Sequence, residues 1–551
     1  MKKTICQAIR GLLLVICASA HLSESQSDES HSALKEARRE VARRTRRIIF
    51  NDDMYELDRK WANSPEGLLR GRLAPLQGTQ VDTISFSVIE ADAPVYDSKV
   101  QPIYGDAHGG PPPYWPNITA NIHALAKLGH CPIQIITDFA HKNKMESWAH
   151  VRMNDVHDSF IPGWLCTWKK EHPELLVDKT GMLPDYKLYV TAQDFSHEEV
   201  RQRKLEIIEE ICRRYDIDGF EIDYIRHPVL FSRTMRGLPT TDVQIQTMTS
   251  LMRQIRKLTD RTAARRGRPI VLATRVPDTL QQSMHIGLDV KSWLQEDLVD
   301  ILIPGGGYAP FSLPVADIVN VARDFQVPVY PCINQGPALT FAGDRANFTT
   351  TTRALATKWY QAGSDGVYVF NLGTPFEYKI GNELDDIRSQ CYDCLYEIGD
   401  PKTLLGKDKL YGLDQPVFHH YIFVSSQPPL PLILKSDTTG KLLLAVSDQV
   451  RTSVEADVRA KYILELGFKG PLKKNLLRVG LNDQPLTTAA LPVTNAGQSK
   501  IIYPLSAPPL KMGENVLDFS LKQSGKATDE QVELVAVYLR VIYSNEHPKS
   551  S

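Results

Sequence analysis

The chain has 551 residues, of which 42% are hydrophobic and 23% are charged, and its formal net charge is -1. A chain of this length needs two or more domains, and its composition is that of an ordinary globular protein. The nearly balanced charge argues against the basic surface that a nucleic-acid-binding protein needs, so we expect no nucleic-acid partner.

The N-terminus predicts an exported protein. Basic residues precede the apolar run 11–18, and the Ala-Ser-Ala sequence at 18–20 fits a cleavage site made of small residues. We therefore expect a signal peptide over 1–20 and a secreted or periplasmic protein without a membrane span, because no later apolar run is long enough. Residues 21–46 are polar and rich in arginine, which predicts a solvated linker or a short helix.

Six cysteines follow the expected cleavage site, which is too few for a disulfide scaffold in a chain of this length. They are Cys131, Cys166, Cys212, Cys332, Cys391 and Cys394. The last two form a single C-x-x-C pair with no second pair to match it, which argues against a zinc site. We expect them to form a local disulfide or to remain thiols.

From residue 47 onward, short β-branched or aromatic runs alternate with helical patterns, which is typical of βα units around a parallel sheet. The predicted strands are 47–52, 82–88, 147–153, 218–224, 270–276, 299–305, 327–333 and 366–372. The predicted helices are 117–129, 132–144, 197–215, 241–266, 314–325 and 350–362. Ser196 and Glu199 predict a capping box at the start of the third helix. The pattern predicts a (β/α)8 TIM barrel over 47–398.

The pattern changes near residue 400, where a loop over 399–415 predicts a linker. Strand-like segments such as "KLLLAVSD", "KYILELGF" and "VELVAVYLRVIY" then follow, separated by turn residues and without a comparable helix. This predicts an all-β sandwich domain over 416–545. Its "GENVLDFSL" segment loosely resembles carbohydrate-binding jelly rolls, so the sandwich is a candidate for binding sugar.

Polar side chains gather where the predicted barrel strands end, which is where TIM-barrel enzymes hold their active sites. Glu221 and Asp223 share one face of the fourth strand because side chains alternate along a strand. We expect Asp223 at the mouth and Glu221 one layer deeper, in a structural role and neutralised by Arg275 or Arg152 on the neighbouring strands. The other residues expected to bind substrate are Asn154, His157, Arg226, His227, Tyr308, Asn371 and Trp115.

The sequences "DGFEIDYIRHP" (218–228) and "RMNDVHD" (152–158), within the βα rhythm, resemble the glycosyl hydrolase-like 10 group of barrel proteins over roughly residues 47–390. The resemblance implies a carbohydrate-active barrel with Asp223 at its centre. The same start is similar to chitinase-type barrels, but Ile225 stands where those enzymes need a glutamate, which argues against their mechanism.

Glycoside hydrolysis normally uses two carboxylic groups. The sequence therefore predicts a glycosidase in which Asp223 works with Asp155, Asp158 or Glu377, without a cofactor and with a poly- or oligosaccharide as substrate. His157 and His227 are alternative proton carriers. Two other functions stay open: a non-catalytic carbohydrate-binding barrel, and a metal-dependent hydrolase in which Asp155, His157 and Asp158 converge.

Overall fold

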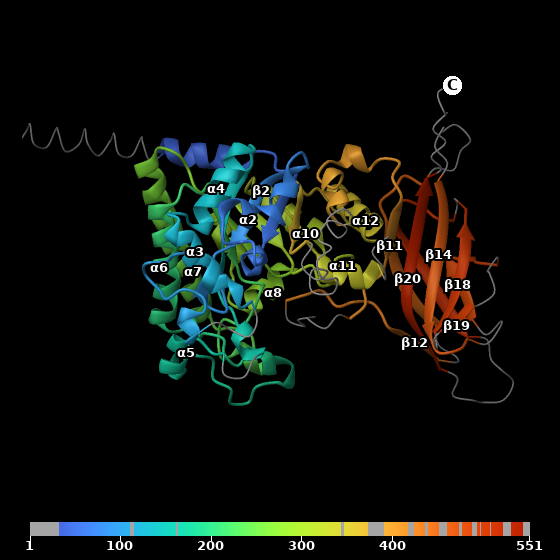
Figure 1. Ribbon diagram of the computed structural model, residues 1–551. Helices are drawn as coiled ribbons and strands as arrows, with labels where there is room; N and C mark the ends of the chain where they lie inside the picture. Colours follow the sequence, from blue (N-terminus) through green and yellow to red (C-terminus); the bar gives the residue numbers. More distant parts are fainter. Residues whose placement is uncertain are drawn as a thin grey trace, which may run out of the picture.

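The protein has two units, an α/β barrel and an antiparallel β domain beside it (Figure 1). The computed structural model describes residues 32–110, 115–160, 164–342, 347–372, 391–416, 424–435, 439–450, 460–472, 477–487, 493–495, 498–506, 509–521 and 531–543. The expected signal peptide and Glu377 lie outside these residues. None of the helices described combines the length and the hydropathy needed to cross a membrane.

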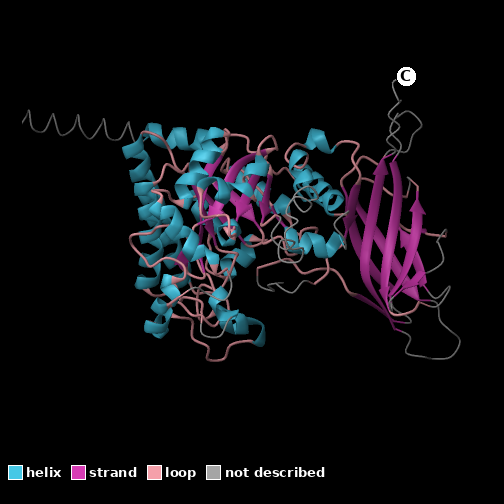
Figure 2. Cartoon of the chain, in the orientation of Figure 1, coloured by secondary structure: helices cyan, strands magenta, loops and turns pink. Residues whose placement is uncertain are grey.

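Eight parallel strands form the barrel, and all eight predicted strands are confirmed. They are β1 (Ile48–Asp52), β2 (Val81–Ser87), β5 (Glu146–Arg152), β6 (Gly219–Asp223), β7 (Val271–Val276), β8 (Ile301–Pro304), β9 (Cys332–Asn334) and β10 (Val367–Phe370). Their order is β8-β7-β6-β5-β2-β1-β10-β9. The first and last strands of the prediction pair directly, with Ile49 opposite Tyr368. Helices surround these buried strands, as Figure 2 shows, so the strands read as apolar runs.

The barrel closes between β8 and the segment before β9. Leu302 forms an isolated parallel bridge with Val329, supported by two 2.9 Å backbone hydrogen bonds, to the carbonyl of Pro328 and from the N–H of Tyr330. The predicted strand 327–333 is therefore divided, because its first part pairs with β8 and only Cys332–Asn334 pairs with β10. Proline lacks the N–H that a continuous ladder needs, and Pro331 lies at the break.

The six predicted helices are confirmed with small shifts at their ends. The helices are α2 (Pro65–Arg70), α3 (Asn117–Lys127), α4 (Pro132–Lys142), α5 (Thr167–Glu171), α6 (Glu198–Arg214), α7 (Asp242–Arg266), α8 (Leu280–His285), α9 (Val290–Gln295), α10 (Val315–Asp324), α11 (Gln335–Ala342) and α12 (Phe348–Gln361). The expected capping box of α6 is wrong, because His197 is the N-cap and its side chain accepts no capping hydrogen bond. A capping box does begin α7, between Thr241 and Gln244.

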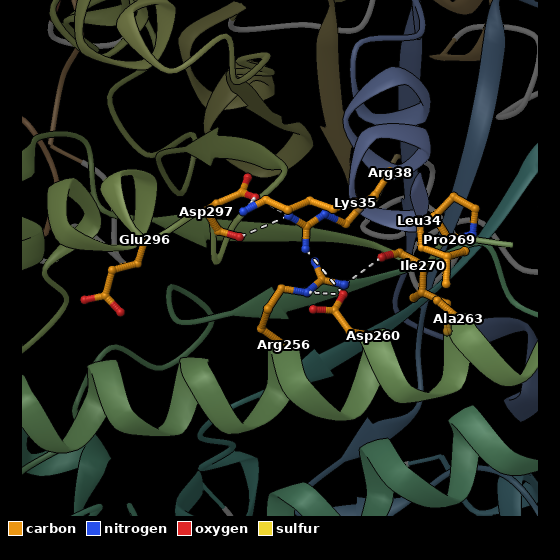
Figure 3. A pocket seen from close by; sticks show the side chains of 10 residues that line it. All are labelled: Leu34, Lys35, Arg38, Arg256, Asp260, Ala263, Pro269, Ile270, Glu296 and Asp297. Atoms are coloured by element: carbon orange, nitrogen blue, oxygen red, sulfur yellow. Dashed lines mark hydrogen bonds and ion pairs between the residues drawn. The ribbon is translucent and has the colours of Figure 1, made fainter. Parts of the chain in front are cut away.

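Residues 32–42 form a helix within the expected linker, and it covers the N-terminal end of the barrel. Arg46, just after it, is fully buried and pairs with Glu146 at the start of β5 at 2.7 Å. Arg38 contacts Asp297 at 2.6 Å and Asp300 at 3.1 Å, immediately before β8. Arg38 and Asp297 line a cavity of about 100 Å³ against α7 (Figure 3).

Two antiparallel sheets form the C-terminal domain, as predicted. One contains β11 (Lys409–Gly412), β12 (Leu432–Lys435), β14 (Ala460–Lys469), β17 (Val493–Asn495), β18 (Gln498–Leu505) and β20 (Gln531–Tyr543). The other contains β13 (Thr439–Val446), β15 (Leu477–Leu481), β16 (Gln484–Pro485) and β19 (Gly513–Leu521). A two-stranded ribbon, β3 (Ile89–Glu90) and β4 (Ala93–Pro94), lies in the barrel domain. β11 falls inside the expected linker, where it pairs with β20.

Candidate active site

Asp223 ends β6 and accepts four hydrogen bonds. The backbone N–H groups of Ile225 and Arg226 donate to one carboxylate oxygen, at 2.7 and 3.0 Å. His150 Nε2 and the guanidinium of Arg275 contact the other oxygen, at 3.0 and 3.3 Å. The side chain is 1% exposed. Asp223 is therefore fixed in orientation by its own turn and by the two neighbouring strands.

The charge state of Asp223 follows from these partners. Burial alone would raise the pKa of a carboxyl, but the charge of Arg275 and the hydrogen bond from His150 hold the pKa of Asp223 well below its usual range. Asp223 is thus an ionised carboxylate at neutral pH. It can stabilise positive charge or act as a nucleophile or base, but it carries no proton to donate.

Glu221 lies one layer deeper on the same face, and the expected arginine partner acts on it only at a distance: the charge of Arg275 favours its ionised form without a direct contact. Ser85 donates to its carboxylate at 2.5 Å and Tyr368 at 2.8 Å, while His150 Nε2 lies 3.7 Å away. Arg275 reaches Asp223 instead. Burial raises the pKa of Glu221 and the charge of Asp223 adds to that effect, whereas the charges of His150 and Arg275 oppose it.

Arg152, which ends β5, forms ion pairs with three carboxylates from three different segments. It contacts Asp53 at 2.7 Å and Asp155 at 2.8 Å, and it also donates to Glu90. The charge of Arg152 outweighs the effect of burial and lowers the pKa of Asp53 to about 2. Asn371, after β10, donates to the same Asp53 at 2.5 Å and so ties the first strand to the last.

A chain of polar contacts runs from Asp155 toward the mouth. His157 Nδ1 donates to Asp155 at 2.6 Å, and His157 Nε2 faces the guanidinium of Arg226 at 2.8 Å. Against the effect of burial, Asp155 and Glu90 raise the pKa of His157, whereas Arg226 opposes them. The net effect raises the pKa of His157 above its usual value, and a histidine can carry a proton.

His227 is held as a neutral ring beside His157. Its Nδ1 accepts the N–H of Val156 at 3.3 Å, which requires an unprotonated nitrogen there. Burial and the charges of His157 and Arg226 lower its pKa well below the usual value. A histidine whose pKa is lowered this far is a poor proton carrier, so His157 is the better of the two histidines expected in that role.

Of the remaining residues predicted to bind substrate, some lie near the candidate site and others hold the loops around it. Trp115 is half-buried, with its ring centroid 6.1 Å from that of His157, and Tyr308 is buried beyond β8. Asn154 donates to the backbone carbonyls of Gln193 and Val229, at 3.0 and 2.7 Å, and so holds the loop after β5.

Asp158 does not join the cluster around Asp155. It pairs with Lys169 at 2.9 Å and accepts the hydroxyl hydrogen of Thr191 at 2.6 Å. The ammonium of Lys169 also donates to the carbonyl of Asp155 at 2.8 Å, which anchors the loop. Asp158 thus has a supporting position rather than one at the centre.

His150 is the central residue that inspection of strand ends did not select. It lies inside β5, directly opposite Glu221, while Arg152 lies opposite Asp223. Its Nδ1 faces the side-chain amide of Asn51 at 3.0 Å. The available signal was its place two residues before Arg152, which puts both side chains on the same inward face.

Two groups of side chains have ligand atoms within 4.8 Å of one another. They are Asp155 with His157 and His227, and His150 with Glu221 and Asp223. The expected metal cluster of Asp155, His157 and Asp158 is therefore wrong in its third member. In each group a guanidinium already contacts a carboxylate, Arg152 on Asp155 and Arg275 on Asp223, and its charge opposes a divalent cation.

All six cysteines among the described residues are free thiols, so the local disulfide at Cys391 and Cys394 is not formed. The Cys394 thiol instead donates to the carbonyl of Cys391 at 3.0 Å.

No protein-family profile and no curated protein matches this chain. Among solved structures it is similar to a cycloisomaltooligosaccharide glucanotransferase from Paenibacillus sp., with 10% identity, a TM-score of 0.31 and coverage of 90% of this chain and 57% of that one. It is also similar to the PgaB (BpsB) glycoside hydrolase domain from Bordetella bronchiseptica, with 11% identity, a TM-score of 0.39 and coverage of 65% of this chain and 99% of that one. A third similar structure is a putative alpha-L-fucosidase from Bacteroides thetaiotaomicron, with 9% identity, a TM-score of 0.33 and coverage of 91% of this chain and 96% of that one. TM-scores this low carry no conclusion about activity.

Proposed function

We propose that this protein is an exported glycoside hydrolase that acts on a poly- or oligosaccharide at the C-terminal end of its barrel. The observation that carries the proposal is the ionised Asp223, held in a cluster of carboxylates, histidines and arginines contributed by neighbouring strands. Barrel enzymes hold their chemistry at this end. The likeness of the 218–228 sequence to the glycosyl hydrolase-like 10 group supports the same substrate class.

In this proposal Asp223 stabilises the positive charge that develops on the sugar ring, either directly as a nucleophile or electrostatically. The Asp155–His157 pair supplies the proton to the leaving oxygen, because His157 can exchange a proton and Asp155 orients it. Glu377 is the alternative second acid. Asp158 is left out of the mechanism, and the sandwich is assigned a role in sugar binding or in packing.

A second candidate is a non-catalytic carbohydrate-binding barrel. The observation that favours it is the complete set of hydrogen bonds to Asp223, which is also almost fully buried. A carboxylate in such surroundings serves equally well as a fixed negative charge that organises the loops at the mouth. The two functions differ in whether a bound glycan is cleaved.

The test is a screen of glycan hydrolysis, followed by a comparison of Asp223→Asn with Asp158→Asn. Both substitutions remove a buried carboxylate that pairs with a cation, so both should lower stability. We expect kcat per folded molecule to fall roughly 10²–10⁴-fold in Asp223→Asn only, the size of effect that a missing acid–base group has.

Three results would contradict the proposed mechanism. Equal losses of turnover in the two variants would remove Asp223 from catalysis. A wild-type protein that binds a glycan without cleaving it would favour the binding barrel. Loss of hydrolysis on chelation, restored by a divalent metal, would favour a metal-dependent hydrolase.

A further inference from the structure

Arg226 differs from the other arginines of the candidate site in its partners. It follows β6 three residues after Asp223, and its guanidinium is half-buried. Its hydrogen-bond partner is His157 Nε2, at 2.8 Å, and it lies 5.9 Å from the ring centroid of Phe370. Its Nε is buried and has no hydrogen-bond partner among the residues that the structure describes.

The contrast with its neighbours is one of charge. Arg152 and Arg275 each contact at least one carboxylate within 3.3 Å. Arg226 forms no ion pair with any carboxylate in the part of the chain that the structure describes. The charge of Asp53 acts on Arg226 without contacting it. The guanidinium therefore keeps its charge and still has donors that no carboxylate among the described residues takes up, and a ligand anion fits these donors.

We propose that Arg226 binds the carboxylate of an acidic sugar, so that the glycan substrate contains uronic acid units. This inference rests on the proposed function and specifies its substrate. A planar guanidinium offers paired N–H donors whose spacing matches a carboxylate, and such charge-assisted pairs are stronger than neutral hydrogen bonds. Sulfate and phosphate groups share this chemistry.

Two neighbours of Arg226 fit the same ligand. Trp115, half-buried and packed against His157 and Trp164, adds an aromatic ring of the kind that lines sugar-binding sites. The contact between Arg226 and His157 Nε2 also links binding to proton transfer. A carboxylate that takes up the guanidinium would free Nε2, which can then exchange a proton with the substrate.

The experiment measures binding of glucuronic acid, glucose and sodium sulfate to the full chain by ligand-detected NMR titration. Glucose is the neutral counterpart of glucuronic acid, so the ratio of the two affinities isolates the carboxylate. A hydrogen bond to a charged group contributes about 1.5–3 kcal/mol, so we expect glucuronic acid to bind at least tenfold more tightly than glucose.

The variants are Arg226→Gln, Arg226→Lys and, as a control, Arg253→Gln. Arg226→Gln should abolish the preference for glucuronic acid, and Arg226→Lys should keep part of it, because lysine retains the charge but not the paired donors. Arg253 is on the outer face of α7, in an exposed ion pair with Glu296, and its loss should leave the preference intact.

The inference is overturned if glucose binds as tightly as glucuronic acid, or if folded Arg226→Gln keeps the preference. If sulfate binds as tightly as glucuronic acid, the ligand of Arg226 is a free inorganic anion and not the carboxylate of a sugar. Binding requires no turnover, so a protein that prefers glucuronic acid without cleaving any glycan would support this inference and contradict the proposed hydrolase.

Discussion

Asp278, after β7, joins the barrel to the segment that leads into the sandwich. Its carboxylate accepts the N–H of Ser426 at 2.6 Å, and its own N–H donates to the carbonyl of Val424 at 3.0 Å. Burial raises the pKa of Asp278 to about 7, and the charge of Asp414 contributes to the rise. The hydrogen bonds from Ser426 favour the ionised carboxylate, but burial outweighs them and favours the protonated form.

The sign of the pH effect follows from linkage. A carboxyl whose folded pKa lies above its unfolded value of about 3.9 stabilises the fold fully below that value, and the contribution is lost as pH rises through about 7. Asp278→Asn keeps an oxygen for Ser426 but cannot ionise. The quantity to compare is the free energy of unfolding of the variant minus that of wild type. We expect this difference to be larger at pH 8 than at pH 5, by about 2 kcal/mol or more.

Urea unfolding at the two pH values measures this difference. Taking variant minus wild type cancels the titrating groups that do not interact with Asp278, so the remaining difference reports Asp278 together with its coupling to Asp414. A difference that is the same at pH 5 and pH 8 would show that Asp278 does not titrate in this range.

At the residue scale, the sequence predicted which strand ends carry charge but not how the charges pair. Alternation along a strand assigns Glu221, Asp223 and Arg275 to the inside, and all three lie there. Their pairing depends on the heights of residues on adjacent strands and on rotamers. Arg275 and Arg152 both lie directly opposite Asp223, but only Arg275 contacts it, so register alone does not decide the pairing.

At the scale of elements, the helix over 32–42 is part of the barrel structure. Its two adjacent arginines differ sharply, with side chains 4% exposed for Arg38 and 42% exposed for Arg39. Arg38 contacts Asp260, Asp297 and Asp300 within 3.4 Å, across the cavity seen in Figure 3. The helix thus holds the N-terminal ends of the strands together through charge.

Replacing each arginine by alanine tests this role. Arg38→Ala removes a buried guanidinium from the buried Asp300 and from the partly exposed Asp260 and Asp297, so we expect a loss of about 3 kcal/mol in the free energy of unfolding. Arg39→Ala, the matched control, removes only exposed ion pairs and should cost less than about 1 kcal/mol. Equilibrium denaturation measures both, and similar small losses would mean that the helix only lies against the barrel.

The sequence predicted an element well where its hydrophobic period and its length indicated the same type of structure. The eight strands are examples, and so is α7, which ends at a glycine. It failed for α6, because His197 takes the capping position that Ser196 and Glu199 seemed to define. It also missed β11, a strand of four residues. Such a strand has too few residues to show a period, and it forms because β20 offers it a partner.

At the scale of the whole molecule, aromatic packing connects the barrel and the sandwich. Phe341 in α11 lies 4.7 Å from the ring of Phe311 and 5.1 Å from that of Tyr538 in β20. Arg540 in the same strand donates to the side chain of Asn347 at 2.7 Å. A buried aromatic contact of this kind couples the unfolding of the two domains.

Phe341→Ala should weaken that coupling. Truncating a buried phenylalanine typically costs about 3–5 kcal/mol, and here the loss falls on the contact between domains. We expect differential scanning calorimetry to resolve separate transitions for the barrel and the sandwich in the variant. Tyr538→Phe keeps the ring contact and should melt as wild type does. A single, nearly unshifted transition in Phe341→Ala would show that the domains are coupled elsewhere.

The divided strand between β8 and β10 gives the barrel a weak seam. Around the Leu302–Val329 bridge, two prolines leave the ladder with few backbone hydrogen bonds, so breathing motions of the closed sheet should begin there. Cys332 borders this seam, and its thiol lies 3.4 Å from Arg275, the partner of Asp223. The part of the barrel that opens most easily is therefore adjacent to the Arg275–Asp223 pair. When it opens, the thiol of Cys332 becomes accessible, and its reaction with a small electrophile in solution measures the opening.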